Sequence, residues 1–298
     1  IISEIKLHFA MRMPSAVIRT EYMDTKRIAP DEERLEYLMG LYLQKYKDTH
    51  FDVILSADTD AFNFLLNNRD EIFPGTPVVF CGIVYFNEKM LEGKSGFTGV
   101  LESYDVKDTL SLMFRLQPQT KHVVIVTDRT ATGLANKKTI DSIIPKFAGN
   151  ASFEYLDNVS TEELSKSVAA LSNDSLILLM TFNRDRSGNF LTYEDAAHLI
   201  REASPIAFYS VYDFYLGYGV LGGKMISGTS QGDVMTGLAF RILEGEKVQN
   251  IPLVRKSPNQ YMFDNSELIR FCINKSNLPP YSFILNQPFE ARSDLEEE

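Results

Sequence analysis

The chain has 298 residues, of which 44% are hydrophobic and 23% are charged, as in soluble globular proteins large enough for two cores. Its 40 acidic residues outnumber its 30 Lys and Arg residues, and the net charge of −10 excludes nucleic acid as an expected partner. Only two cysteines are present, Cys81 and Cys272, which excludes a disulfide framework and a thiolate metal cluster. Both are expected to be buried small hydrophobic residues.

The first elements in chain order are a helix, a strand and a second helix. Residues 1–9 repeat apolar side chains at helical spacing, and residues 16–22 are typical of a strand. Pro30 and three acidic residues then open a helix that ends near residue 47. Its single apolar stripe indicates packing and no chemistry.

The stretch 51–66 organises the first part of the chain. Residues 53–55 are apolar and predict a buried strand, and residues 61–66 carry apolar side chains at helical spacing. Between them lies a polar turn, at the place where open α/β sheets hold ligands. The alternative is that Asp58 or Thr59 is only the N-cap of the helix, which is the commonest use of such residues.

Strands and helices then alternate, which predicts parallel sheets with helices on both faces, an α/β fold. Two capping boxes, Ser160 with Glu163 and Thr192 with Asp195, mark helix starts. A Gly-rich segment and a polar, acidic tail are expected to be irregular. The predicted strands are 77–81, 97–101, 122–126, 153–156, 176–180, 206–211, 252–254 and 261–263; the predicted helices start near 106, 132, 160, 192 and 232; the Gly-rich segment is 217–228 and the tail 282–298.

Several short motifs, in this order, resemble the extracytoplasmic sensor modules of bacterial signalling proteins, which are related to ABC-transporter solute-binding proteins. The resemblance spans nearly the whole chain. Its motifs are Glu21–Arg27, Phe51–Ile54 with Ala57-Asp58, Pro77–Gly82, Gln231-Gly232 leading to Arg241–Glu246, Asn259–Asp264, Leu278-Pro279-Pro280 and Asn286-Gln287-Pro288.

The resemblance implies the type I periplasmic-binding-protein fold, with two Rossmann-like lobes, three crossings and a ligand cleft between the lobes. It implies lobe 1 from residues 1–104 and 229–250, lobe 2 from 105–228 and 251–265, and a tail 266–298 leading toward a membrane segment. In this group that segment connects to a histidine kinase, as in two-component systems, or to a diguanylate cyclase. Members usually begin with a strand and a loop ahead of the first helix, and this chain begins in that helix, so part of the first lobe is expected to be absent or supplied by another chain.

In this topology the ligand faces the loops that follow the strands. These loops are 56–60, 81–83 and 102–104 in lobe 1, and 127–132, 181–185 and 210–214 in lobe 2. The residues expected to contact the ligand are Ser56, Asp58, Thr59, Asp60, Cys81, Gly82, Thr127, Asp128, Arg129, Thr130, Asn183, Arg184, Tyr212, Asp213 and Phe214.

For the loops of lobe 2, two interpretations stay open. Arg129, at a hydroxyl-rich helix start, suits a carboxylate or phosphate, or else it lies in solvent beside a capped turn. Arg184 binds the ligand or pairs with a neighbouring acid. Tyr212, Asp213 and Phe214 combine rings with a carboxylate, which suits an amine or an aromatic ring.

An enzyme is the least favoured class. The four histidines are scattered, with no carboxylate at metal-ligand spacing beside them, so no metal site is predicted. No nucleophile elbow or phosphate-binding loop is present, and no cofactor is expected. Asp58 and Asp60 as an acid/base pair are less expected than as helix caps.

The sequence therefore predicts a non-catalytic sensor domain that closes on a small molecule, with an amino acid or another zwitterion as the favoured ligand. A homodimer is a further possibility, and contact with the membrane is expected through a segment outside this sequence. The expected location is the periplasmic face, anchored in the inner membrane. The alternatives are a freestanding solute-binding protein that serves an ABC permease and an α/β enzyme acting in the cleft between the lobes.

Overall fold

The computed structural model describes residues 1–25, 28, 31–83 and 86–288, and it divides the chain into two compact units. Unit 1 comprises residues 1–103 and 226–258, and unit 2 comprises 104–225 and the chain from 259 onward. The predicted lobes placed 251–258 with the second lobe. These residues lie in unit 1, where Val254 bridges Val100 in parallel.

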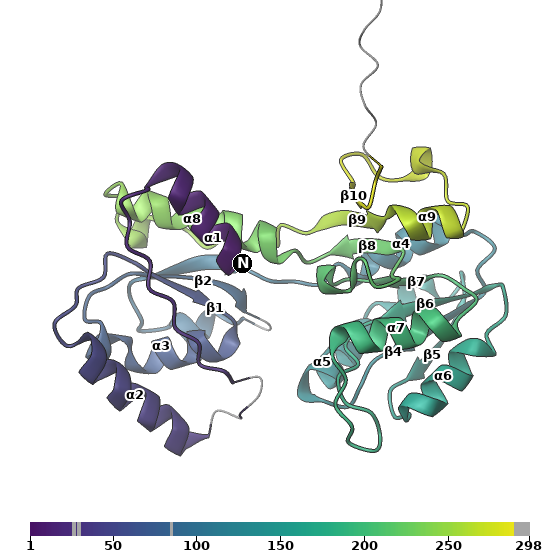
Figure 1. Ribbon diagram of the computed structural model, residues 1–298, viewed down its shortest axis with the longest axis horizontal. Coiled ribbons are helices and arrows are strands. Elements are labelled where there is room, and N and C mark those ends of the chain that lie inside the picture. Colours follow the sequence, from purple (N-terminus) through teal and green to yellow (C-terminus); the bar gives the residue numbers. More distant parts are fainter. Residues whose placement is uncertain (26–27, 29–30, 84–85, 289–298) are drawn as a thin grey trace, which may run out of the picture. The chain divides into compact units, whose positions relative to one another are not determined.

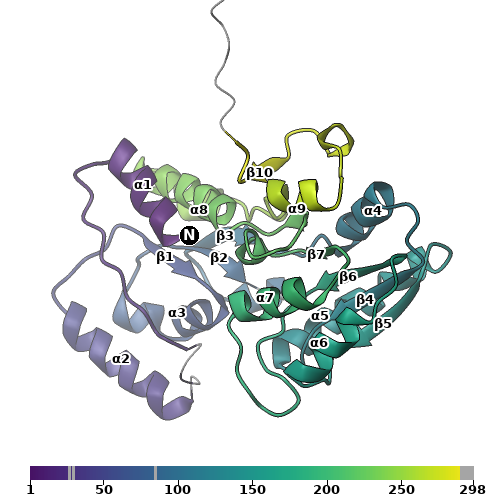
Figure 2. The same cartoon turned by 45° about the vertical axis from the view of Figure 1, so that its right-hand side comes forward.

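The sheet of unit 1 has three parallel strands in the order β1-β2-β3, all three of which are labelled in Figure 2. Ile54 lies opposite Val78, which in turn lies opposite Phe97. The middle strand is apolar over almost its whole length because helices cover both of its faces. The strands are β1 (Ile54–Ala57), β2 (Val78–Ile83) and β3 (Phe97–Leu101).

Two helices cover each face of this sheet. Helices α1 and α8 pack on one face, and α3 packs on the other with α2 outside it (Figure 1). Phe9 meets Phe240 at 4.9 Å between ring centroids on the first face, and Phe62 meets Phe80 at 4.6 Å on the second. The helices of unit 1 are α1 (Ile2–Arg12), α2 (Glu32–Tyr46), α3 (Thr59–Ile72) and α8 (Gly228–Leu243), with the 3-10 helices η1 (Glu88–Leu91) and η4 (Val248–Asn250).

The sheet of unit 2 has seven strands in the order β10-β9-β8-β7-β6-β4-β5, which are labelled in Figure 1. All neighbours are parallel except β8 and β9. The strands are β4 (His122–Val126), β5 (Ser152–Leu156), β6 (Ser175–Leu179), β7 (Phe208–Ser210), β8 (Gly222–Met225), β9 (Gln260–Asp264) and β10 (Phe283–Leu285).

The helices of unit 2 start where the sequence places their caps. Both predicted capping boxes are confirmed: Ser160 and Glu163 open α6, and Thr192 and Asp195 open α7. Helices α6 and α7 pack against each other, and α4 packs against β7 and β8; all five elements are labelled in Figure 1. The helices are α4 (Val106–Leu116), α5 (Ala131–Asp141), α6 (Thr161–Ala169), α7 (Tyr193–Ala203) and α9 (Asn265–Arg270), with η2 (Ile144–Phe147), η3 (Asp213–Tyr215) and η5 (Lys275–Asn277).

Two predicted strands are wrong and two strands were missed. Residues 16–22 form no strand, because no described strand lies beside them and Val17 and Tyr22 are exposed. Residues 252–254 make only the single bridge of Val254. Conversely, β8 lies inside the Gly-rich segment, and β10 lies in the polar tail and pairs with β9.

Other local differences have simple causes. The helix predicted to start near residue 132 ends at Asp141, and a 3-10 helix follows with Pro145 in its first turn. Cys272 is exposed, in contrast to the prediction, because it follows the end of α9 at a φ of +54°. Pro30 and the acidic end of the tail, 295–298, lie outside the described residues. Among the helices that the structure describes, none has the length and apolar character that crossing a bilayer requires.

Candidate functional site

Asp128 ties together two strand ends of unit 2. It follows β4, and its side chain is buried although it carries a charge. One carboxylate oxygen accepts from the backbone N–H of Thr130 at 3.0 Å and from the Thr130 hydroxyl at 2.5 Å. The other accepts from the backbone N–H groups of Asn183 at 2.7 Å and Arg184 at 3.4 Å, just past β6. Asp128 therefore fixes the carboxyl edge of the sheet.

Further buried polar side chains lie at the same edge. Asn136 of α5 donates to the Thr181 hydroxyl at 3.1 Å and accepts from the Tyr212 hydroxyl at 3.3 Å. The Thr127 hydroxyl is buried and has no hydrogen-bond partner among the described residues. The sequence analysis missed Asn136, because a single amide in the middle of a helix gives no signal of its own.

Five aromatic rings gather beside the same edge. Tyr212 lies 4.9 Å from Phe214 and 5.4 Å from Tyr104 between ring centroids, and Phe214 also lies 4.0 Å from Tyr193. Tyr215 packs 4.8 Å from Phe214. Burial holds the pKa of both Tyr212 and Tyr215 well above the usual value, so these phenols stay protonated and cannot act as general bases.

Asp213 is next to two of these aromatic residues in the sequence. It is half-buried at the start of η3, between Tyr212 and Phe214 in the chain. A carboxylate beside aromatic faces attracts a cation through both its charge and the ring quadrupoles. The structure brings the predicted rings of Tyr212 and Phe214 together within unit 2, and the ligand contact of Asp213 stays a prediction.

The two predicted arginines lie farther out. The side chain of Arg129 is 60% exposed, and its guanidinium lies 3.7 Å from the carboxylate of Asp157. Arg184 is also exposed, and it donates to the backbone carbonyl of Gly188 at 3.3 Å. Thr130 caps α5 by accepting from the backbone N–H of Gly133 at 3.2 Å. The structure thus brings Thr127, Asp128, Thr130 and Asn183 together and leaves both guanidinium groups at the surface.

The predicted residues of unit 1 form a second strand-to-helix turn. Asp58 has a φ of +83°, and its side chain accepts from the backbone N–H of Thr59 at 2.6 Å. Its own backbone N–H donates to the Cys81 carbonyl at 3.1 Å, which ties the turn to β2. Asp58 is thus the N-cap of α3, as the alternative interpretation held, and Asp60 lies in the first turn of that helix.

The thiol and the serine hydroxyl near this turn are buried. Burial raises the pKa of the Cys81 thiol to about 12, so the thiol is not a nucleophile at neutral pH. The Ser56 hydroxyl is buried without a hydrogen-bond partner among the described residues. Gly82 has a φ of +68°, and a Cβ there would lie 3.4 Å from the backbone nitrogen of Asp58. This contact is an ordinary van der Waals distance, so it is the positive φ that favours glycine at position 82.

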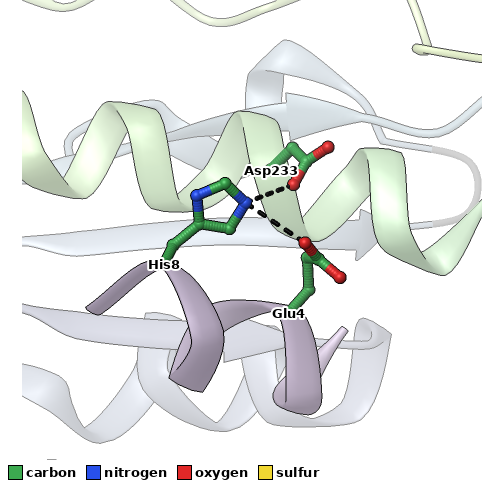
Figure 3. A group of neighbouring side chains, drawn as sticks. All are labelled: Glu4, His8 and Asp233. Carbon is green, nitrogen blue, oxygen red and sulfur yellow. Dashed lines mark hydrogen bonds and ion pairs between the residues drawn. The ribbon is translucent and has the colours of Figure 1, made fainter. Parts of the chain in front are cut away.

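A third group of polar side chains lies elsewhere in unit 1. Glu4 and His8 are four residues apart on α1, and Asp233 of α8 faces them (Figure 3). The expectation that no histidine has a carboxylate at metal-ligand spacing is therefore wrong. The signal in the sequence is the spacing of Glu4 and His8, which are one helical turn apart within a predicted helix.

Sequence-based comparison leaves the chain without an assigned family. No family model matches it, and no curated protein matches it either. Solved structures do match over nearly the whole length.

Three of these structures show the fold. A ligand-free, open substrate-binding protein from Clostridium difficile is 13% identical with a TM-score of 0.65, covering 95% of this chain and 94% of that one. An ABC domain in complex with L-Trp from Streptococcus pneumonia is 13% identical with a TM-score of 0.59, covering 91% and 90%. An ABC-transporter solute-binding protein from Bacillus halodurans with bound myo-inositol is 10% identical with a TM-score of 0.52, covering 93% and 92%. The predicted two-lobed α/β fold of the periplasmic-binding-protein type is confirmed.

Proposed function

We propose that this chain is an extracytoplasmic ligand-binding module, and that it serves as the sensor domain of a membrane-linked signalling protein. The binding role is supported by the fold shared with substrate-binding proteins and by the polar edge of the unit 2 sheet. The sensor role is supported by the order of motifs along the sequence. The chain's location outside the cytoplasm and its link to the membrane belong to the same proposal.

The ligand carries an ammonium group that binds near Asp213. The observation that carries this choice is the half-buried carboxylate of Asp213 at the aromatic cluster, at the edge that Asp128 holds in shape. Rings and a carboxylate together favour a cation that is only partly desolvated. The backbone N–H groups at the amino end of α5 favour an anion at the same edge. A group that attracts a cation and a helix end that attracts an anion, at one edge, suit an amino acid or another zwitterion.

Signalling requires that the ligand distinguishes between two conformations of the chain. A ligand that binds both conformations equally shifts no equilibrium, whatever its affinity. The proposed ligand therefore stabilises one arrangement, and that arrangement activates the output domain.

A freestanding solute-binding protein is the first alternative, and the structural neighbours fit it equally well. The sequence that follows residue 298 in the full-length protein separates the two, because a sensor requires an apolar span there. An enzyme is the second alternative. Cys81 offers it no nucleophile at neutral pH, because burial raises the pKa of the thiol to about 12.

A thermal-shift panel of amino acids, organic acids, polyols and nucleobases tests the binding role, because a ligand that binds only the native state raises the melting temperature. For a hit, Asp213→Asn is expected to weaken binding at least about tenfold, equal to about 1.4 kcal/mol. Arg129→Ala is the matched control and is expected to leave affinity within about twofold, because its side chain is 60% exposed and pairs with Asp157. Equal affinity of wild type and Asp213→Asn would place the site elsewhere.

A further inference from the structure

One imidazole nitrogen in unit 1 faces two carboxylates. Nε2 of His8 lies 3.2 Å from a carboxylate oxygen of Glu4 and 2.6 Å from one of Asp233 (Figure 3). All three ligand atoms lie within 4.8 Å of one another. A neutral imidazole carries at most one proton on Nε2, so this nitrogen can donate a full hydrogen bond to only one of the two carboxylates.

The two helices that carry these side chains are held in close contact. Gly232 of α8 faces α1, and a Cβ there would lie 3.2 Å from the Cβ of Glu4 and 3.3 Å from the Ile1 carbonyl oxygen. One residue further along α8 is Asp233. At the far end of α1, Arg12 pairs with Glu244 and Phe9 packs on Phe240. The backbones on both sides of the group are thus fixed before any ligand arrives.

We propose that Glu4, His8 and Asp233 bind a divalent cation of the Zn²⁺ class, which clamps α1 onto α8. One imidazole and two carboxylates match the donor set that Zn²⁺ accepts in proteins. The cation also neutralises two carboxylates that otherwise face each other across one nitrogen. Mg²⁺ and Ca²⁺ are disfavoured, because both require oxygen ligands in larger number.

The present spacing requires only small movements. Ligand atoms around a tetrahedral Zn²⁺ with bonds of about 2.0–2.1 Å lie about 3.3 Å apart, close to the 3.2 Å between His8 and Glu4. Asp233 must retreat slightly from Nε2, and its side chain can do so because it is 47% exposed. The exposure of His8 and Asp233 leaves the fourth position to water.

A Zn²⁺ titration of the purified chain, followed by calorimetry and thermal unfolding, tests the site. We expect one ion per chain and a higher melting temperature, because the cation binds only when α1 lies on α8. His8→Ala and Asp233→Asn are expected to weaken Zn²⁺ binding at least about tenfold and to abolish the thermal shift, and Mg²⁺ should cause no shift in any variant.

His122→Ala is the matched control. Nε2 of His122 also lies near a carboxylate, at 3.3 Å from Glu154, but it has no second carboxylate within ion-pair distance among the described residues. This variant should respond to Zn²⁺ as wild type does. Circular dichroism checks that each variant is folded, and Asp233→Asn preserves side-chain shape if His8→Ala does not fold. The proposal is overturned if wild type shows no Zn²⁺ response, or if both ligand variants bind Zn²⁺ as wild type does.

Discussion

The turn after β1 in unit 1 and the turn after β4 in unit 2 start from the same sequence pattern and end in different structures. Each follows an apolar strand, contains an aspartate and opens a helix. Asp58 caps its own helix by a bond to the next residue, whereas Asp128 accepts from Thr130 and from Asn183, 55 positions away. The aspartate side chain after the strand therefore caps a helix in unit 1, whereas in unit 2 it joins two strand ends.

This difference indicates which interactions make a ligand-binding edge rigid. A local cap stabilises one helix start by about 1 kcal/mol, whatever the neighbouring strand does. A buried carboxylate that joins two strand ends fixes the distance between the loops that follow them. For this reason we place the candidate site in unit 2.

The largest expected loss of stability comes from replacing Asp128 with asparagine, which has the same shape. The same replacement of Asp58 provides the comparison. In Asp128→Asn, one oxygen becomes an NH₂ group that faces a backbone N–H, because both oxygens of Asp128 accept. We expect a loss of about 3 kcal/mol of unfolding free energy. Asp58→Asn should cost less than about 0.5 kcal/mol, because asparagine caps helices well and tolerates positive φ. Urea unfolding of both variants measures the contrast, and equal losses would remove the distinction between the two turns.

A glycine beside Asp128 gives the next largest effect. A Cβ at Gly133 would overlap both the carbonyl and the carboxylate of Asp128. Gly133→Ala is expected to cost about 2 kcal/mol, since the aspartate cannot move without losing its partners. Gly149→Ala meets no atom within 4 Å and should change the unfolding free energy by less than about 0.5 kcal/mol. Thermal unfolding compares the two, and a cost of Gly133→Ala no larger than that of Gly149→Ala would show that the turn is loose.

Removing either of the two buried hydroxyl groups should change stability by a similar small amount, whereas the two aspartate replacements should differ. Neither Ser56 nor Thr127 has a hydrogen-bond partner for its hydroxyl among the described residues. Ser56→Ala and Thr127→Val are each expected to change stability by less than about 1 kcal/mol, because removing an unsatisfied hydroxyl costs little. A loss of about 2 kcal/mol or more in either variant, measured by urea unfolding, would show that the removed hydroxyl makes a hydrogen bond in the folded protein.

The smallest effect is a pH dependence at the cap of α6 in unit 2. A backbone hydrogen bond from Ser160 holds the pKa of Glu163 below its usual value of 4.5, with a further contribution from Arg186. Because the folded-state pKa is lowered, this contribution to stability is present above about pH 4.5 and is lost as the pH falls through the folded value. The difference in melting temperature between wild type and Glu163→Gln should therefore shrink between about pH 6 and about pH 3. A constant difference would exclude the cap as its source.

The sequence predicted the elements far better than their contacts. The apolar strands and the capping boxes of α6 and α7 are local signals, and the structure confirms them. Strand β8 was hidden because Gly222 and Gly223 replace the usual branched residues. Added side chains there would overlap Phe263 and the Ser210 carbonyl, so the packing of the finished sheet decides these positions.

The long-range hydrogen-bond and ion-pair partners of side chains could not be predicted either, because they depend on how strands and helices pack in the folded chain. Asp128 and Asn183 come together only because β4 and β6 are neighbours in the sheet. Glu4 and His8 share one helical face in the sequence, but the position of Asp233 depends on how α8 packs on α1. Arg129 and Arg184 gave a stronger charge signal than Asn136, yet both lie at the surface and Asn136 is buried.

Hydrogen–deuterium exchange with and without a ligand identified by the thermal-shift panel tests the central claim most directly. If a small molecule binds the carboxyl edge of the unit 2 sheet, backbone amides of 127–132, 181–185 and 210–215 should exchange more slowly when the ligand is present. The turn at 144–150, between α5 and β5, provides an internal reference and should not change. Protection confined to other segments, with these three turns unchanged, would contradict the proposed site.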